Sequence, residues 1–398
     1  MQFRKDQKTQ KELSVLGYGC MRFPRNFGKI DLKKTEELIL KAFNAGVNYY
    51  DTARIYPGSE EALGAVVAKN NLREKIFIAT KLPVITCHNT SDFDKFFLES
   101  LKQLKTDYID YYLMHMLTDI ESWEKLKRLG IEEWIAQKKQ SGAIKQIGFS
   151  FHGAQNQFLK ILDAYPWEFC QIQYNYFDEN YQAGKTGLKA ASAKGIPVII
   201  MEPLLGGKLV TGLPLAAKNA FKKANPDCSP AQWGLNWLWN QSEVSVVLSG
   251  MSDSGQLSDN LDCADKAHSG MLKDHDLTVF EQVKEAFNAA YKVHCTGCNY
   301  CMPCPCNVNI PGCFSAFNSS YAINRTEGSK QYVTSTAAFS ATPHTASLCT
   351  ECGKCENHCP QHIEIRKELK NVKKRLEPPF FRIIILIARL VFKQHRRK

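Results

Sequence analysis

Three stretches of sequence decide the fold: VNYYDT (47–52), KIFIATK (75–81) and IDYYLMH (109–115). Each is a short run rich in β-branched and aromatic residues, and the segments between them, such as 93–105, have the apolar spacing of helices. The same kind of run occurs in five further places: SVLGYGC (14–20), IKQIGFS (144–150), FCQIQYN (169–175), PVIIMEP (197–203) and VSVVLSG (244–250). Because strands that alternate with helices over short connections form right-handed parallel units, the sequence predicts a parallel sheet. Eight such units before residue 270 predict an α/β fold with a closed (β/α)8 TIM barrel, and an open doubly wound sheet is the alternative.

The composition and charge of the chain exclude several functions. Hydrophobic residues make up 44% of the 398 residues and charged residues 23%, which are the values of an ordinary soluble globular protein. Of the net charge of +11, twelve Lys and Arg against three Glu after residue 360 supply +9. The rest of the chain is therefore close to neutral, so we expect no nucleic-acid partner. The first residues, MQFRKDQKTQ, contain no apolar secretory segment, and we expect a cytoplasmic protein.

Four polar side chains follow consecutive strands of the predicted barrel. Asp51 and Tyr56 follow the second strand, Lys81 closes the third and His115 closes the fourth. Active sites of such barrels lie at the C-terminal ends of the strands, so we expect these side chains to share one mouth. An ammonium beside a phenol favours the phenolate, so Lys81 is predicted to lower the pKa of Tyr56, and Asp51 to keep the ammonium charged. His115 could donate a hydrogen bond to a substrate oxygen, which suits proton donation to a carbonyl as hydride arrives at its carbon.

The stretches DTARIY, IFIATK and DYYLMH resemble the aldo-keto reductase family, whose fold is this barrel. The likeness extends over residues 1–265. It implies that Tyr56 is the general acid, that Lys81 and Asp51 tune it, and that His115 orients the carbonyl. It also implies an NAD(P)-dependent oxidoreductase that acts on a small carbonyl or alcohol, with NAD(H) or NADP(H) bound across the barrel mouth.

The same resemblance implies a set of cofactor contacts. In GFSFHG it places Ser150 near the nicotinamide carboxamide, and in QIQYN it makes Gln171 the second carboxamide partner. The other implied contacts follow the seventh and eighth strands: Met201, Gly206, Ser249, Gly250, Gln256 and Asn260. Met201 stands where many family members have an aromatic ring that stacks on nicotinamide. Met251 and Ser252 stand where NADP users often carry Lys or Arg, so the choice between NAD and NADP stays open.

Two groups of closely spaced cysteines indicate a second kind of site, in which thiolates bind metal. The first group is Cys295, Cys298, Cys301 and Cys304, and the second is Cys349, Cys352, Cys355 and Cys359. The second group, with its C-x2-C-x2-C-x3-C-P spacing, resembles bacterial two-cluster ferredoxins, and the first repeats it with a last gap one residue shorter. The resemblance implies two [4Fe–4S] clusters in which Cys359 crosses to the first group and Cys304 to the second. Cys306 is the alternative to Cys304, and a pair of structural zinc sites is the alternative for all eight thiolates.

We expect three segments: the barrel over 1–270, an iron–sulfur ferredoxin-like domain of helices and loops over 271–376, and an amphipathic basic tail over 377–398. Within the second segment a helix is predicted over 277–291, and the polar residues 315–346 are expected to form loops with a short helix.

The tail, from Phe380 to Lys398, begins with an apolar run that is too short to span a bilayer and ends in KQHRRK. One interpretation is an interfacial helix that contacts the inner face of a membrane peripherally. The other is a helix that docks on a partner or on the barrel itself.

The sequence therefore predicts an iron–sulfur oxidoreductase of aldo-keto reductase type, whose clusters pass single electrons to or from a redox partner protein or a flavin. A hydride carries two electrons and a cluster accepts one, so direct coupling needs a flavin or a substrate radical, and the sequence shows no flavin motif. Two other hypotheses stay open. The barrel could be a scaffold in an electron-transfer or assembly protein, or the clusters could be structural parts of an ordinary carbonyl reductase.

Overall fold

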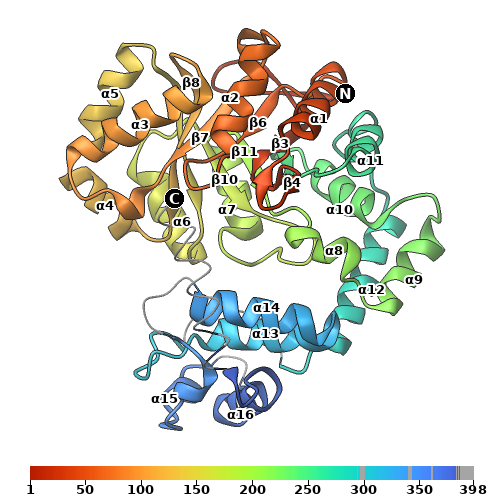
Figure 1. Ribbon diagram of the computed structural model, residues 1–398. Coiled ribbons are helices and arrows are strands. Elements are labelled where there is room, and N and C mark those ends of the chain that lie inside the picture. Colours follow the sequence, from red (N-terminus) through yellow and green to blue (C-terminus); the bar gives the residue numbers. More distant parts are fainter. Residues whose placement is uncertain are drawn as a thin grey trace. The chain divides into compact units, whose positions relative to one another are not determined.

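Figure 1 shows the computed structural model, which describes residues 1–293, 295, 301–338, 343–359, 362–381, 383 and 385. The described chain forms two compact units. The first consists of Met1–Gly206 and Ala231–Lys273, and the second of Gly207–Pro230 and the described residues from Asp274 onward. The chain thus leaves the first unit after Gly206, contributes a short segment to the second unit and returns at Ala231.

The first unit is a closed barrel of eight parallel strands, each beside the next one in the chain (Figure 1). The strands are β3 (Leu16–Gly19), β6 (Tyr49–Asp51), β7 (Phe77–Leu82), β8 (Ile109–Leu117), β9 (Ile144–Phe151), β10 (Phe169–Gln173), β11 (Val198–Met201) and β12 (Val244–Ser249). The barrel closes where β12 pairs with β3, with Val247 opposite Leu16. The predicted (β/α)8 barrel is therefore confirmed. The open doubly wound alternative is wrong, because the first and last strands pair and leave no free sheet edge.

Helices connect the barrel strands. They are α1 (Leu32–Asn44), α2 (Ser59–Lys69), α3 (Thr90–Leu104), α4 (Ile120–Arg128), α5 (Ile131–Gln140), α6 (Gln155–Ala164), α7 (Gly184–Ala193), α10 (Pro230–Trp239) and α11 (Ser254–Ala264). Local signals fix their ends: the Asp31 side chain accepts the backbone N–H of Lys34 at the start of α1, and Asn89 and Asp92 form a capping box at the start of α3. α1 ends before Gly46, whose φ of +92° lies in the left-handed region that glycine adopts freely.

The alternation of side chains along the strands places polar residues one layer above an apolar core. The barrel interior is filled by Leu13, Tyr49, Ala79, Tyr111, Leu113, Phe169, Ile199, Val246 and Leu248. Because successive residues of a strand point to opposite faces, the residue two positions later returns to the same interior. Two positions after Tyr49, Ala79, Leu113, Phe169 and Ile199 come Asp51, Lys81, His115, Gln171 and Met201. The barrel therefore presents these side chains at the C-terminal ends of its strands, above an apolar floor.

A short hairpin that the sequence patterns did not indicate covers the opposite end of the barrel. This hairpin is formed by β1 (Phe3–Lys5) and β2 (Glu12–Ser14). A second, separate hairpin is formed by β4 (Arg25–Asn26) and β5 (Lys29–Ile30). The last residue of β2 donates its backbone N–H to Asn48 Oδ1 at 2.8 Å, just before β6, and the buried Asp6 carboxylate accepts the Tyr111 hydroxyl at 2.8 Å. Strands of two or three residues are too short to show an alternating pattern, which is why the sequence analysis missed them.

The second unit is helical. Its elements are α8 (Lys208–Thr211), α9 (Leu215–Ala224), α12 (Asp274–Ala290), α13 (Ile310–Ala322), α14 (Arg325–Val333), α15 (Lys354–Asn357) and α16 (Ile365–Leu376). The interpretation of 315–346 as loops with a short helix was wrong, because α13 and α14 occupy much of it. Asn309 and Asn324 cap these two helices, and the buried Phe314 and Phe317 anchor α13 in the core of the unit. The polar composition of the segment concealed both signals.

The helix predicted over 277–291 is present as α12, which begins three residues earlier. It packs against α9 through the rings of Phe221 and Phe280, whose centroids are 5.8 Å apart. This contact explains why the segment that contains α9 belongs to the second unit although the chain later returns to the barrel.

The described part of the tail packs on the core of the second unit. Phe381 and Ile385 are buried in that core, with the Phe381 ring 5.5 Å from the Tyr332 ring, whereas Phe380 and Ile383 are exposed. Residues 386–398 lie outside the described residues, so membrane contact by the tail stays a prediction. In the part of the chain that the structure describes, no helix is both long and apolar enough to cross a membrane.

Removal of the hydrogen bond between Tyr111 and Asp6 tests whether this contact holds the β1–β2 hairpin on the barrel. Tyr111→Phe removes a hydroxyl that donates to a buried carboxylate, and we expect it to lower the free energy of unfolding by about 1.5–3 kcal/mol. Tyr112→Phe is the matched control, because the Tyr112 hydroxyl is buried without a hydrogen-bond partner and its loss should be neutral or stabilising. Chemical denaturation measures both variants, and equal losses would contradict this account.

Candidate active site and cysteine-lined cavity

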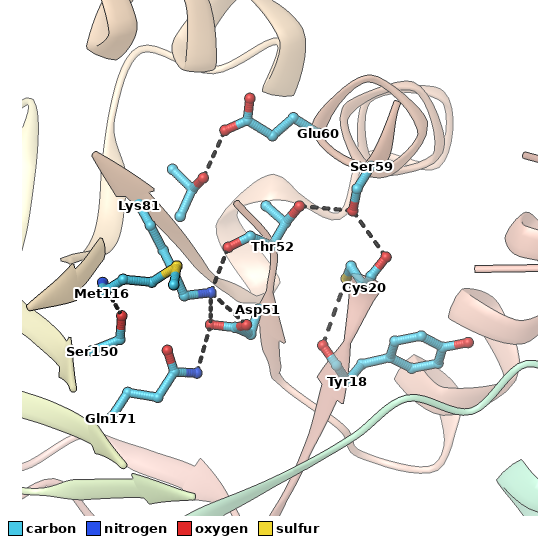
Figure 2. A network of polar contacts seen from close by, with 11 residues as sticks. Tyr18, Cys20, Asp51, Thr52, Ser59, Glu60, Lys81, Met116, Ser150 and Gln171 are labelled. Atoms are coloured by element: carbon cyan, nitrogen blue, oxygen red, sulfur yellow. Dashed lines mark hydrogen bonds and ion pairs between the residues drawn. The ribbon is translucent and has the colours of Figure 1, made fainter. Parts of the chain in front are cut away.

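Lys81, at the end of β7, forms a buried ion pair at the barrel mouth (Figure 2). Its Nζ donates to Asp51 Oδ1 at 2.7 Å, to Asp51 Oδ2 at 2.8 Å and to the Thr52 carbonyl oxygen at 2.8 Å. Only 1% of Lys81 and 4% of Asp51 is exposed, so the charges attract each other across a medium of low dielectric constant. Burial lowers the pKa of Lys81, but Asp51 and the nearby Tyr56 raise it by more, and the ammonium stays charged.

The Tyr56 ring lies against this ion pair. Lys81 Nζ is 5.3 Å from the centroid of the Tyr56 ring. The His115 ring meets the Tyr56 ring edge to face, with centroids 6.0 Å apart. Asp51, Lys81 and His115 come from three successive barrel strands, and Tyr56 comes from the loop between β6 and α2. The structure thus brings all four residues of the predicted set together.

Burial sets the protonation states of the two rings. It raises the pKa of the Tyr56 phenol, and the Lys81 ammonium lowers it by less, so the net direction is upward. The lowering expected from Lys81 alone is not found, because the sequence does not show how far the phenol is removed from water. Burial, and then the Lys81 ammonium, hold the pKa of His115 well below its usual value, so the imidazole is neutral. His115 Nδ1 is buried without a hydrogen-bond partner, which leaves it available to a ligand.

Ser150 on β9 and Gln171 on β10 each keep one polar function for a ligand. Ser150 Oγ accepts the backbone N–H of Met116 at 2.9 Å, so the hydroxyl can still donate its proton. Gln171 Nε2 donates to Asp51 Oδ2 at 3.1 Å, while its Oε1 is buried without a partner (Figure 2). A primary carboxamide has one acceptor and two donors, which match the Ser150 hydroxyl and Gln171 Oε1. These residues therefore fit the carboxamide of a nicotinamide.

Arg22, which the sequence analysis missed, reaches both glycines implied for the cofactor. Arg22 is the last residue of the short helix Cys20–Arg22 after β3. Arg22 Nη1 is 3.5 Å from the Gly206 carbonyl oxygen. A Cβ on Gly250 would lie 2.9 Å from Arg22 Cδ. Gly206 has a φ of +66°, a left-handed conformation that favours glycine. The guanidinium is half exposed and 3.6 Å from Glu202. A guanidinium between two glycine loops can bind phosphate, and the position of Arg22 just beyond a strand end was the available sequence signal.

The other implied cofactor residues make local contacts. Asn260 Nδ2 donates to Ser249 Oγ at 2.8 Å, which ties α11 to the end of β12. Gln256 Oε1 accepts the backbone N–H of Ser252 at 3.0 Å and holds the turn before α11. Met201 is partly buried and packs against the barrel core. These contacts shape the loop after β12, and direct contact with a cofactor stays a prediction.

A supporting network behind the mouth was also missed. The Thr80 hydroxyl donates to the buried Glu60 Oε1 at 2.6 Å. Ser59 Oγ donates to the Cys20 carbonyl oxygen at 2.9 Å and is 2.8 Å from Thr52 Oγ1 (Figure 2). Because Ser59 and Glu60 begin α2, these bonds fix α2 against β6 and β7, the strands that carry the ion pair.

Cysteines from both predicted groups line one cavity in the second unit. Its thiols belong to Cys304, Cys306, Cys349, Cys352 and Cys355, and Arg366 and Leu369 of α16 complete the wall. Cys349 Sγ also accepts the backbone N–H of Glu351 at 3.4 Å. Within the described residues, no three His, Cys, Asp or Glu side chains are placed to hold a single metal ion. Five cysteine sulfurs gathered at one cavity, with an N–H directed at one sulfur and an arginine nearby, fit the ligands of an anionic iron–sulfur cluster.

The other predicted set is only partly described, because Cys298 lies outside the described residues. Cys295, Cys301 and Cys359 are half-buried and pack against the same core of the second unit. Both groups of cysteines thus contact one small apolar core.

Two family descriptions match this chain. Residues 15–271 match the aldo/keto reductase family, and residues 294–364 match a 4Fe-4S dicluster domain. These matches confirm both resemblances that the sequence analysis drew from its motifs.

Individual proteins are similar over the barrel. An aldo-keto reductase from Mycolicibacterium vanbaalenii is 29% identical over 260 residues, which cover 64% of this chain and 83% of that protein. The NAD/NADP-dependent indole-3-acetaldehyde reductase of Schizosaccharomyces pombe is 27% identical, covering 58% of this chain and 79% of that protein. The holo structure of a Bacillus halodurans aldo-keto reductase has a TM-score of 0.58 at 22% identity and covers 71% of this chain and 96% of that one. At that identity, the last likeness concerns the fold alone.

Separate substitutions of Cys304 and Cys306 test which of the two thiolates is a cluster ligand in the cysteine-lined cavity. Cys304→Ser is expected to lower the iron content from about eight to about four ions per chain, since it removes one ligand of a [4Fe–4S] cluster. Cys306→Ser is the matched control, because Cys306 lines the same cavity with its Sγ 3.0 Å from Thr350 Oγ1. Iron analysis and electron paramagnetic resonance of the reduced protein measure the effect. Loss of iron in the Cys306 variant alone would make Cys306 the ligand.

Proposed function

Because the chain belongs to the aldo/keto reductase family and carries a 4Fe-4S dicluster domain, we propose that it interconverts a small carbonyl compound and its alcohol with a nicotinamide cofactor. The observation that carries this proposal is the convergence of Tyr56 and His115 on the buried ion pair of Lys81 and Asp51. Each of the four side chains has a distinct chemical task in that reaction.

Tyr56 is the proton donor. A bound nicotinamide would supply the hydride to the carbonyl carbon, and the Tyr56 hydroxyl supplies the proton to the oxygen, which completes the two-electron reduction. The raised pKa of Tyr56 keeps the proton in place until charge develops on the oxygen. The Lys81 ammonium, held by Asp51, then stabilises the phenolate that is left. The neutral His115 imidazole orients the carbonyl by a hydrogen bond.

Several contacts support a nicotinamide at this mouth. The unpartnered Gln171 Oε1 and the Ser150 hydroxyl suit a carboxamide, and Arg22 between Gly206 and Gly250 suits a phosphate. The Schizosaccharomyces relative is described as using NAD or NADP, and the same pair of cofactors is proposed here.

The dicluster domain implies two [4Fe–4S] clusters, and we infer that they carry single electrons between the protein and a redox partner. The cysteine cavity lies near the surface of the second unit, where Cys352 is exposed, which suits exchange with an outside carrier. A second candidate is a structural role, which is favoured by the packing of Cys295, Cys301 and Cys359 on the small core of the second unit.

Tyr56→Phe separates the enzyme from the scaffold hypothesis. We expect carbonyl reduction to fall by a factor of about 10² or more, because the proton donor is lost, while iron content and the cluster signal stay unchanged. Tyr112→Phe serves as the control, since the Tyr112 ring packs against Phe97 of α3 and Trp134 of α5 and its hydroxyl has no partner. Assays of NAD(P)H oxidation with a panel of aldehydes and ketones measure the effect. Full activity of the Tyr56 variant would remove the proposed mechanism.

Addition of NADH and then NADPH to the anaerobic, iron-replete protein tests the coupling of the clusters to the barrel. If the clusters exchange electrons with the barrel, electron paramagnetic resonance should show a reduced-cluster signal without any carbonyl substrate. If neither cofactor produces the signal but dithionite does, the clusters are structural or receive electrons from another donor. A reduced-cluster signal produced by NADH or NADPH, without a carbonyl substrate, would also point to a bound flavin, which its visible absorbance would reveal.

A further inference from the structure

The second unit carries a groove that neither the cysteine cavity nor the barrel site uses. Its walls are Lys292, Phe317, Tyr321, Arg325, Glu368, Asn371, Lys374 and Arg375. These residues come from α13, α14 and α16, except Lys292, which follows the end of α12; Figure 1 labels the four helices. The groove has a volume of about 550 Å³ and is open to solvent. A feature of this size is large enough to receive a ligand or a protruding part of a partner.

The groove is strongly basic. Four cations, Lys292, Arg325, Lys374 and Arg375, face it against one carboxylate, that of Glu368. Among the residues that the structure describes, none of the four cations forms an ion pair with an acid, and Glu368 accepts a hydrogen bond from Asn371 at 3.0 Å. The positive charge is therefore left unneutralised, and it attracts anions.

Three of the four cations are held in place although they repel one another. Arg375 donates from Nε to Ser320 Oγ at 2.9 Å and from Nη2 to the Ser320 carbonyl oxygen at 2.8 Å. Its guanidinium lies 4.0 Å from the centroid of the Tyr321 ring, and Lys292 Nζ lies 5.3 Å from the same ring. Arg325 donates to the Arg375 carbonyl oxygen at 3.1 Å. These bonds and cation–π contacts preorganise the charge before any partner arrives.

The groove lies close to the cysteines. Cys295 is three residues after Lys292, so their Cα atoms are at most about 11 Å apart. On α16, Arg366 and Leu369 wall the cysteine cavity, while Asn371 and Lys374 wall the groove. At 100° per residue these pairs lie on different faces of the helix, and their midpoints are five residues apart along it, so about 13 Å separates the two sites. Electron transfer is efficient over such short distances because its rate falls exponentially with separation.

We propose that this groove is the docking site for the acidic surface of a small one-electron carrier protein. In each encounter one electron moves: the carrier is oxidised as a cluster is reduced, or the reverse. Redox encounters use small, polar interfaces, and complementary charge raises their rate of association, which an open basic groove provides. An enclosed, mainly apolar pocket would instead suit a small molecule. The inference rests on the proposed function only in that the clusters carry electrons.

Reduced flavodoxin, a small acidic carrier whose oxidation has its own absorbance, is the probe. Anaerobic stopped-flow mixing with the full-length, cluster-loaded protein measures the rate of electron transfer at low salt. The test variant is Lys292→Glu with Lys374→Glu, both exposed residues of the groove. The matched control is Lys218→Glu with Lys222→Glu, exposed residues of α9 in the same unit that change the net charge equally.

We expect the groove variant to transfer electrons about 10-fold more slowly or worse, and the control within about twofold of the unmodified protein. The difference should shrink at ~0.5 M salt, where the Debye length is only about 4 Å. Equal rates for the two variants overturn the proposal, as does failure of the unmodified protein to accept electrons from flavodoxin when dithionite reduces its clusters. Free FMN is the probe for a small anionic ligand. If FMN binds the unmodified protein but not the groove variant, and the flavodoxin rates of the two are equal, the groove is a site for a small anion and the proposal is overturned.

Carbonyl reduction by the same preparations is measured in parallel. Its absence, together with salt-sensitive electron uptake through the groove, would reject the proposed carbonyl chemistry and leave the docking site standing. Carbonyl reduction by these preparations, together with equal electron uptake by both variants, would instead reject the docking site and leave the proposed carbonyl chemistry standing.

Discussion

The buried ion pair of Lys81 and Asp51 is the constraint on which the barrel mouth depends. Removing both charges from water is expensive, and the cost is offset only while the ammonium keeps its three oxygen acceptors, two on Asp51 and one on Thr52. β6 and β7 must therefore stay in register, and α2 holds them there through Ser59 and Glu60. The charge that this arrangement preserves gives the Tyr56 phenol a cationic neighbour in a place otherwise shielded from water.

The layered interior of the barrel gives the mouth its shape. Apolar side chains fill the lower layers, and the next inward position on several strands carries a polar group. The same alternation brings Gln171 to Asp51 and leaves its Oε1 unpartnered, so a residue that supports the ion pair also keeps one acceptor unused at the mouth. One side chain can thus combine structural support with the ligand contact that we propose, because the narrow barrel leaves few inward positions at its upper end.

In the second unit, a small apolar core packs against the cysteines. α16 takes part in two sites: one face, with Leu369, closes the cysteine cavity, and another, with Lys374, borders the basic groove. A single helix thus lies between the cysteine cavity and the basic groove, which is the arrangement that the proposed docking site uses. The buried Phe381 and Ile385 extend this core to the beginning of the tail.

The sequence by itself determined the eight strands, the four polar strand ends and the two cysteine groups, because each depends on local periodicity or spacing. Only the tertiary structure decided the rest. The sign of the Tyr56 pKa shift follows from burial, which no local pattern reports. The reach of Arg22 to Gly206 and Gly250 joins residues far apart in the chain, and the helices within 315–346 depend on a shared core. Contacts of this kind exist only once the chain has folded, so spacing along the sequence could not show them.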